Sequence, residues 1–220
     1  LTGYAKRRND PLDVCGSSRM SAYVNCGMID PLRMARDAAR VSEKFVSEFC
    51  GDHPCGNCRV DLHAVDATST HHWLIPAGFR ESAHLWCLRN PGAYLDASRA
   101  VPAWARNQLR ATAAAPDVEA LARGASGDAY WDDCQKCLVL SGELHNNVRM
   151  AWGKAIPAWH GAALSGQEAT PATRLQAALD LLVRLNDTYA LDGGSPPSYG
   201  GLLWCLGWCD PVWKSNSELG

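Results

Sequence analysis

The sequence has no hydrophobic run long enough to cross a membrane. A membrane-spanning helix needs about 20 consecutive apolar residues, and no stretch of the 220 residues approaches that length. A large positive charge is also missing, because the net charge is −2. This excludes a protein that binds nucleic acid through bulk positive charge, so contact with DNA would need a local patch such as Lys6, Arg7 and Arg8.

The pattern of β-strands is missing as well. Runs of β-branched residues are scarce, alanine is abundant, and no segment of useful length alternates apolar and polar residues. We therefore predict an all-α protein, a single helical domain over residues 1–220 without internal repeats. Helices are expected over 73–90, 102–113, 126–141 and 143–160, with a connector at 91–103 and a tight loop at 191–201.

Two further helix starts are marked by their first residues. Asp30 and Thr170 suit the N-cap position, and each precedes a proline, which suits the first turn of a helix. After Thr170, leucines recur at helical spacing, at positions 175, 179, 182 and 185. This stripe predicts a helix face that packs into the core.

The ten cysteines do not resemble the framework of a small secreted domain. The chain is too long and too helical for a disulfide scaffold, and no signal-peptide pattern follows Leu1. We therefore expect an intracellular protein with reduced thiols and no membrane partner. The pair Cys55-x-x-Cys58, in an irregular segment over 50–72, has the spacing of zinc ligands, but a second pair outside a predicted helix is missing. We predict no metal site, and structural zinc is the minority alternative.

A short segment, GSSRMS over 16–21, has the composition of a phosphate-binding loop. Hydroxyl and backbone N–H groups donate hydrogen bonds to phosphate oxygens, and Arg19 adds positive charge. Arg80, next to Glu81, could place a second guanidinium on a phosphate. A serine-rich turn and an ordinary surface ion pair are the alternatives that the composition leaves open.

Polar side chains gather on the helix expected over 143–160. His145 and Arg149 are four residues apart and share a face, as do Asn146 and Met150. A row of hydrogen-bonding side chains over an apolar helix suits the edge of a heteroaromatic ring. The alternative is a polar face in contact with solvent.

Three tryptophans offer a path for electrons. Trp152 and Trp159 are about 10 Å apart along one helix face, given a rise of about 1.5 Å per residue. Trp131, on the preceding helix, could pack beside Trp152. This spacing permits electron transfer between indole rings, and packing in the core is the alternative for each tryptophan.

Carboxylates and an amide precede a glycine-rich turn in RLNDTYALDGG. Asn186, Asp187 and Asp192 could hold a polar ring or a ribose. The alternative is the end of a helix followed by a turn.

The order of these motifs resembles the photolyase/cryptochrome family of flavoproteins. The segments are YAKRRNDP, GSSRMSAYVNCGMIDP, FRESAH, YWDDCQKCLVLSGELHNNVRMAWGKAIPAW and LNDTYALDGGSPPSYGGLLWCLG. They run from about residue 4 to residue 210 and are similar to the helical FAD-binding domain of the family, without its α/β antenna domain. The sequences of these motifs are most similar to those of class II photolyases of cyclobutane pyrimidine dimers and of short photolyase-like proteins.

The resemblance implies FAD as the cofactor. It implies that the N-terminal segments and Arg80 hold the phosphates and the ribityl chain, that Asn146 and Arg149 lie beside the isoalloxazine ring, and that Asn186 lies near flavin N5. The cofactor-binding residues implied in this way are Tyr4, Ser17, Ser18, Arg19, Met20, Ser21, Arg80, Asn146, Arg149, Asn186, Asp192 and Gly193.

The resemblance also implies a light-driven reaction. Trp131, Trp152 and Trp159 match in spacing the tryptophan chain that photoreduces the flavin in class II enzymes, and with Asn186 they form the expected catalytic group. The expected substrate contacts are Phe79, Asn147 and Trp204, with Trp204 similar to an aromatic that packs against a flipped pyrimidine dimer.

The implied function is electron transfer from reduced FAD to a pyrimidine dimer in DNA, the reaction of a deoxyribodipyrimidine photo-lyase-like enzyme. The alternatives are a blue-light photoreceptor without repair activity and an inactive flavin-binding remnant.

The sequence departs from the family pattern near the expected substrate. Pro76, Ala77 and Gly78 occupy the stretch where the family has a substrate-contacting glutamate, and Phe79 stands where a tryptophan is common. The loop expected near the dimer contains Ser195-Pro196-Pro197 in place of the usual polar residues. These departures are compatible with FAD binding, because they change residues expected to contact the dimer during repair.

Overall fold

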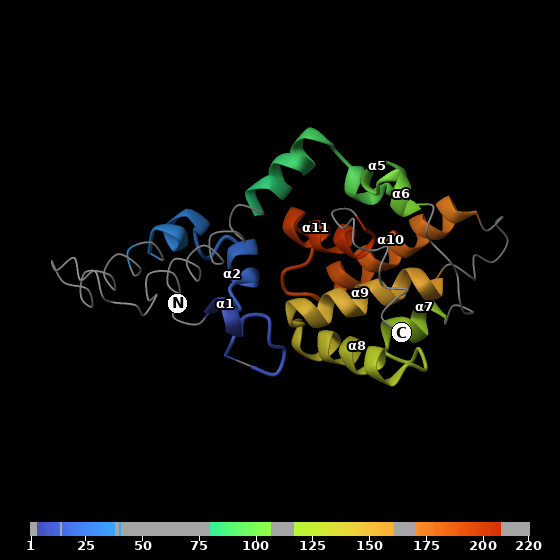
Figure 1. Cartoon of the computed structure of the whole chain (residues 1–220), viewed down its shortest axis with the longest axis horizontal. Coiled ribbons are helices and arrows are strands. Elements are labelled where there is room, and N and C mark those ends of the chain that lie inside the picture. Colours follow the sequence, from blue (N-terminus) through green and yellow to red (C-terminus); the bar gives the residue numbers. More distant parts are fainter. Residues whose placement is uncertain are drawn as a thin grey trace, which may run out of the picture. The chain divides into compact units, whose positions relative to one another are not determined.

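The computed structural model describes residues 4–13, 15–37, 40, 80–106, 117–160 and 170–207. Within these ranges the chain forms helices and no strand (Figure 1), which confirms the all-α prediction. The chain divides into two compact units, Leu1–Ser82 and Ala83–Gly220, and the single domain over 1–220 stays a prediction. The cysteine-rich segment 50–72 and Phe79 lie outside the described residues. Among the helices described, none is long and apolar enough to span a bilayer.

The second unit contains four longer helices, α8 (Ala129–Ser141), α9 (Asn146–His160), α10 (Pro171–Tyr189) and α11 (Pro196–Cys205). The predicted start of α10 is confirmed, because the side chain of Thr170 accepts a hydrogen bond from the N–H of Thr173 at 3.2 Å. α9 packs against α8, α10 and α11 (Figure 1). Side chains on α9 therefore meet residues from all three other helices.

Shorter helical segments are η1 (Ala93–Leu95), α5 (Ala97–Ala100), α6 (Ala103–Arg106) and α7 (Val118–Ala122). The prediction of a plain connector over 91–103 is therefore wrong in part. The side chain of Asp96 accepts a hydrogen bond from the N–H of Ser98 at 2.9 Å and starts α5. α7 has no counterpart among the expected helices, because five residues are too few for a helical period to be visible.

The tight loop predicted over 191–201 is also wrong beyond Ser195, where α11 begins. The hydroxyl of Ser198 accepts from the N–H of Ser195 at 3.3 Å and donates to its carbonyl oxygen at 2.8 Å. Pro196 and Pro197 occupy the first turn, where a missing N–H breaks no helical hydrogen bond. A serine followed by two prolines was thus a helix start, not a turn.

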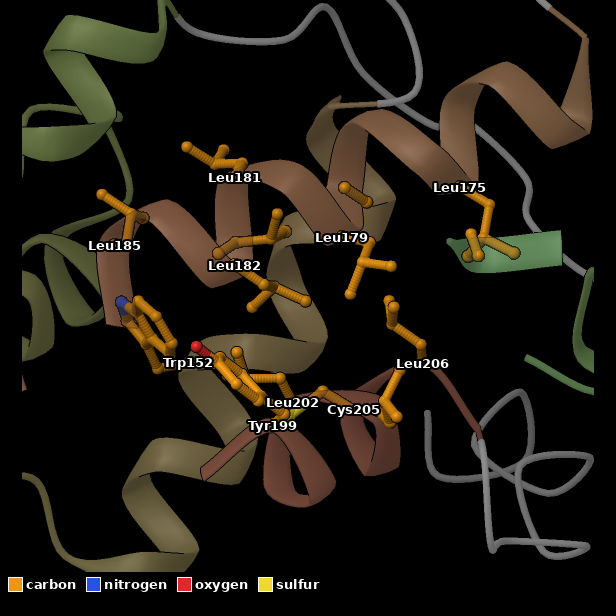
Figure 2. Packing of buried hydrophobic residues seen from close by; sticks show 14 of the residues in the cluster. Trp152, Leu175, Leu179, Leu181, Leu182, Leu185, Tyr199, Leu202, Cys205 and Leu206 are labelled. Atoms are coloured by element: carbon orange, nitrogen blue, oxygen red, sulfur yellow. The ribbon is translucent and has the colours of Figure 1, made fainter. Parts of the chain in front are cut away.

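The leucine stripe of α10 lies in the core, as predicted. Its four members, Leu175, Leu179, Leu182 and Leu185, are at most 1% exposed. Figure 2 shows them in one cluster with Trp152 of α9 and with Tyr199, Leu202 and Cys205 of α11. Full burial of a leucine contributes about 1.5–3 kcal/mol. This packing positions the polar residues that follow the stripe.

A glycine in α9 allows α11 to approach closely. A Cβ on Gly153 would lie 2.5 Å from Cys205 Sγ and 3.3 Å from Cys205 Cβ. We expect Gly153→Ala to lower the free energy of unfolding by about 1–3 kcal/mol through overpacking, although alanine favours a helix by about 1 kcal/mol over glycine. Urea denaturation measures the change.

Gly201 in α11 is the matched control. No atom lies within 4 Å of a Cβ built there, so Gly201→Ala should raise the free energy of unfolding by roughly 0.5–1 kcal/mol. Opposite signs for the two substitutions are expected. Equal stabilisation by both would contradict the close packing of α9 against α11.

A buried carboxylate organises the loop before α8. Asp132 Oδ1 accepts from the N–H and the hydroxyl of Ser126 at 2.7 and 2.6 Å, and Oδ2 accepts from the N–H of Gly127 at 3.3 Å. Burial acts to raise the pKa of Asp132, but these hydrogen bonds favour the charged form and bring the pKa below its ordinary value.

The lowered pKa makes the contribution of Asp132 depend on pH. It is present above the ordinary carboxyl pKa of about 3.9 and is lost as the pH falls through the lower folded value. We expect Asp132→Asn to cost about 1–3 kcal/mol at neutral pH, and the difference from wild type to shrink below about pH 4. The exposed neighbour provides the control, Asp133→Asn. A difference that is constant with pH would show that the carboxylate has no such role.

In the first unit, α1 (Tyr4–Arg7) and α2 (Ser21–Asn25) flank a long turn, and a further helix covers 31–37. The N–H of Leu32 donates to Asp30 Oδ1 at 2.8 Å, which confirms the predicted start at Asp30. The expected helix over 73–90 is described from residue 80 and is helical over 80–89.

Candidate functional site

Arg149 of α9 joins two side chains that are distant in sequence. Its Nη1 donates to Asp192 Oδ1 at 2.8 Å and its Nη2 donates to Asn186 Oδ1 at 2.6 Å. The side chains of Arg149 and Asp192 are 19% and 22% exposed, so the ion pair is shielded but can still be reached from outside. The structure thus brings together three of the residues predicted for one site, and we call them the Arg149 group (Arg149, Asn186 and Asp192).

A glycine turn returns Asp192 to the end of α10. A Cβ on Gly193 would lie 2.5 Å from the carbonyl oxygen of Asn186, and the N–H of Gly193 donates to the Ala190 carbonyl at 2.9 Å. Backbone this close leaves no room for a side chain. The turn at Gly193 sets Asp192 beside Arg149, and a contact between Gly193 and FAD stays a prediction.

The side-chain amide of Asn186 has a fixed orientation. Asn186 is 1% exposed, and its Nδ2 donates to Asp187 Oδ1 at 2.8 Å and to Ser198 Oγ at 3.2 Å. Arg149 offers only donors, and an ionised Asp187 offers only acceptors. The Oδ1 atom must therefore face Arg149, and its second lone pair remains for another donor.

Asp187 is held by α11 and by the glycine turn. It accepts hydrogen bonds from the N–H of Gly194 at 2.9 Å and from the hydroxyl of Tyr199 at 3.0 Å. The Tyr199 ring stacks on Tyr94 at a centroid distance of 4.2 Å. Burial, and then the hydrogen bond to Asp187, raise the pKa of Tyr199 well above its ordinary value. The phenol therefore stays a donor across the physiological pH range.

Two of the predicted tryptophans form a buried stacked pair. The rings of Trp131 and Trp152 are 6.1 Å apart and inclined by 10°. The indole N–H of Trp131 donates to the Trp152 carbonyl at 2.9 Å, and the indole N–H of Trp152 donates to Gln135 Oε1 at 3.0 Å. We call them the tryptophan pair. Trp159 lies in α9, and its side chain lies outside the described part.

The tryptophan pair begins one helical turn from the Arg149 group. Trp152 follows Arg149 by three residues on α9, and residues at this spacing share a helix face. Polar side chains that suit a ring edge and an aromatic path into the core therefore start from the same stretch of α9.

The first unit contains the predicted phosphate segment. Arg80 Nη2 donates to the carbonyl oxygen of Ser21 at 3.2 Å, so the second predicted guanidinium lies at the end of Ser17–Ser21. Arg19 has a positive φ of 51°, which is uncommon outside glycine, asparagine and aspartate. The side chains of Ser17, Ser18 and Arg19 are exposed. Hydroxyls and two guanidinium groups are thus gathered in one unit.

An ion pair fixes the turn before this segment. Arg7 donates to both oxygens of Asp13, at 2.6 and 3.0 Å, and this hydrogen bonding lowers the pKa of Asp13. A Cβ on Gly16 would lie 2.5 Å from the Arg7 carbonyl oxygen. The glycine of GSSRMS therefore allows the chain to pass close to α1, where Tyr4 is half-buried.

The other predicted residues have surface positions. Asn146 and Asn147 are exposed at the start of α9, and Trp204 on α11 is 42% exposed. Met20 is half-buried. In the ranges that the structure describes, no three side chains could together hold a metal ion, and the zinc alternative at Cys55 lies outside those ranges.

This chain is similar to several curated proteins, some of which match its whole length. It is 28% identical over 227 residues to a protein of Methanothermobacter thermautotrophicus named deoxyribodipyrimidine photo-lyase. It is 26% identical over 226 residues to a protein of the same name from Arabidopsis thaliana, and 30% identical over 148 residues, 64% of this chain, to one from Potorous tridactylus. No family model matches.

The chain is a relative of the photolyases. It covers 42% and 39% of the first two of these proteins and corresponds to their C-terminal part. The relationship to photolyases that the order of motifs predicted is therefore confirmed.

In this photolyase relative, several residues that orient the predicted site residues were not predicted from the sequence. The sequence indicates no role for Gln135 or Tyr199, and it suggests Asp187 only as a contact to a polar ring or a ribose, not as a partner of Asn186. A signal for Gln135 existed, because it follows Trp131 by four residues and so shares its helix face. For Tyr199 there was none, since α11 was expected to be a loop.

Proposed function

We propose that this chain is the FAD-binding part of a light-driven DNA repair enzyme that acts on pyrimidine dimers. The observation that carries the proposal is the Arg149 group next to the tryptophan pair on α9. Relatives named photo-lyase support the same reaction class, although the chain spans only about two fifths of the first of them. Repair, FAD binding and DNA binding are all part of this proposal.

The residues present fit the polar edge of a flavin ring. Two of the five N–H donors of Arg149 are used in the bonds to Asn186 and Asp192. Asn186 Oδ1 has a lone pair left for a ring N–H, and the partial exposure of the ion pair leaves an approach. The group therefore offers both donors and acceptors, as a ring with alternating carbonyl and N–H groups requires.

FAD, when bound and reduced, would supply the electron that cleaves the dimer after absorbing blue light. The chain itself would orient the ring through Arg149 and Asn186. The tryptophan pair would pass electrons from a reductant in solution toward the ring. Trp204 is 42% exposed, and a base flipped out of DNA would stack on its indole.

In this proposal, Arg80 binds the phosphates of FAD. Its guanidinium donates to the carbonyl oxygen of Ser21, and Arg80 and Ser17–Ser21 together would hold the pyrophosphate of FAD. We expect Arg80→Ala to weaken FAD binding by on the order of tenfold, about 1.4 kcal/mol, by leaving phosphate charge unpaired. Titration of FAD by fluorescence quenching measures this.

Arg89→Ala, at the other end of the helix over 80–89, is the control and should leave the affinity unchanged. Arg80→Lys should recover part of it, since lysine keeps the charge but lacks the planar fork of donors. If Arg80→Ala binds FAD as tightly as wild type, Arg80 has no part in holding the phosphates.

Repair is tested with an oligonucleotide that contains one thymine dimer. The protein, loaded with FAD and chemically reduced, should restore the two thymines under blue light and not in the dark, as measured by chromatography of the oligonucleotide. Light-dependent restoration at the level of buffer with free FAD would overturn the repair proposal.

A photoreceptor is the second candidate, because Pro76, Ala77 and Gly78 replace the expected substrate-contacting glutamate. It predicts that the tryptophan pair still reduces bound flavin in light while dimers are left intact. The same oligonucleotide assay, combined with the absorption spectrum of the flavin, separates the two candidates.

A further inference from the structure

Gln135 is the only fully buried glutamine among the described residues, with 0% exposure. Its side chain spans two elements: Oε1 accepts the indole N–H of Trp152 at 3.0 Å, and Nε2 donates to the Ala122 carbonyl at 3.1 Å. A buried amide is costly unless its groups are hydrogen-bonded. Here both are, so the orientation of the amide is fixed and its oxygen faces the indole.

The hydrogen bonds of the tryptophan pair have a common chemical feature. The indole N–H of Trp131 ends on the carbonyl oxygen of Trp152, and that of Trp152 ends on the amide oxygen of Gln135. Both acceptors are amide oxygens, which accept hydrogen bonds but do not take up a proton near neutral pH. Trp131 and Trp152 are 2% and 1% exposed, so bulk water is not a ready acceptor either.

This feature matters when an indole loses an electron, because its N–H then becomes acidic. If the proton leaves, the neutral radical that remains is a poor acceptor for the next electron, and transfer stops at that ring. If the proton stays, the radical cation can take an electron from the neighbouring ring, and the positive charge moves on.

We propose that Gln135 is a positioning residue that keeps Trp152 protonated when it is oxidised, so that the charge passes on to Trp131. The proposal rests on the electron-transfer role of the tryptophans in the proposed function. Trp152 gives one electron to the excited flavin, and Trp131 then gives one electron to Trp152. Flavin is reduced by one electron, Trp131 is oxidised by one, and no proton leaves either indole in these two steps.

The test replaces the amide by a base of the same shape. In Gln135→Glu, an ionised carboxylate faces the indole N–H and can take its proton, whereas Gln135→Met has similar size and no acceptor. Spectra are recorded at about pH 9, so that a carboxyl whose pKa is raised by burial is ionised. Near-ultraviolet circular dichroism first establishes that the aromatic packing is retained in each variant.

The first arm needs no flavin. A short ultraviolet flash ejects electrons from indoles directly, an added electron scavenger removes them, and the transient spectrum distinguishes cationic from neutral indole radicals. Relative to wild type, Gln135→Glu should lose part of the cation band and gain neutral-radical absorption, with slower conversion in D2O. Gln135→Met should not. Identical spectra for wild type and Gln135→Glu would overturn the proposal.

The second arm uses the FAD-loaded protein and a blue flash. Oxidised tryptophan should form in wild type as the cation, with no effect of D2O on the first steps, and should remain at Trp152 as the neutral radical in Gln135→Glu. A neutral radical at the pair in wild type would contradict the proposal. If the first arm succeeds and no tryptophan is oxidised by blue light, the proposed function fails while the role of Gln135 stands.

Discussion

Arg149→Met is expected to weaken FAD binding strongly and to lower the free energy of unfolding by about 2–3 kcal/mol. The methionine fills a similar volume but leaves Asp192 without its cation and Asn186 Oδ1 without its donor. FAD affinity should fall by on the order of a hundredfold, about 2.7 kcal/mol. Affinity is measured by titration, and stability is measured by urea denaturation of the FAD-free protein.

Arg184→Met is the matched control. Arg184 and Glu119 form an ion pair at 2.7 Å, but their side chains are 55% and 58% exposed, and such pairs contribute about 0–1 kcal/mol. FAD binding should be unaffected. If the two substitutions have the same effect on FAD affinity, Arg149 is a structural residue and the Arg149 group is not the cofactor site.

Trp152→Phe is expected to slow the light-driven reduction of bound flavin by at least on the order of tenfold, about 1.4 kcal/mol in the barrier. Phenylalanine preserves an aromatic ring beside Trp131 but is much harder to oxidise than an indole. FAD content should be unchanged, because Trp152 lies a turn beyond the Arg149 group. The decay of flavin absorbance under blue light with a sacrificial reductant measures the rate.

Two further variants distinguish electron transfer through the tryptophan pair from an effect on packing. Trp131→Phe should also slow the reduction, since it removes the second ring of the pair. Trp104→Phe, at a partly exposed indole on α6 without an assigned role, should leave the rate unchanged. Equal rates in wild type and Trp152→Phe would exclude the tryptophan pair as the path.

Local signals gave the parts of the fold that depend on neighbours in sequence. Asp30 and Thr170 start helices because their side-chain oxygens cap N–H groups two or three residues away. The leucine stripe of α10 follows from a helical period alone. α11 was not predicted, although Ser195 and Pro196 form a helix start of the same kind. The glycines and prolines around them also favour a turn, and a turn was predicted.

Three of the residues predicted for the cofactor site lie together in the structure, whereas the residues that hold them in place were not predicted. Arg149, Asn186 and Asp192 were expected together on the basis of the resemblance, and tertiary structure joins them. The roles of Gln135 and Asp187 depend on partners that only the folded chain provides, such as the Ala122 carbonyl and the Tyr199 hydroxyl. The spacing of Gln135 from Trp131 places both on one helix face, but it does not show which groups the side-chain amide of Gln135 would bond.

The central claim is that the helical chain holds a flavin at the Arg149 group, beside an aromatic path. Its most direct test is the absorption spectrum of the purified protein after addition of FAD and removal of the excess, before and after blue light. We predict the bands of bound oxidised flavin in wild type, their bleaching in light, and their absence in Arg149→Met. A wild-type protein that remains colourless after loading with FAD would contradict the account.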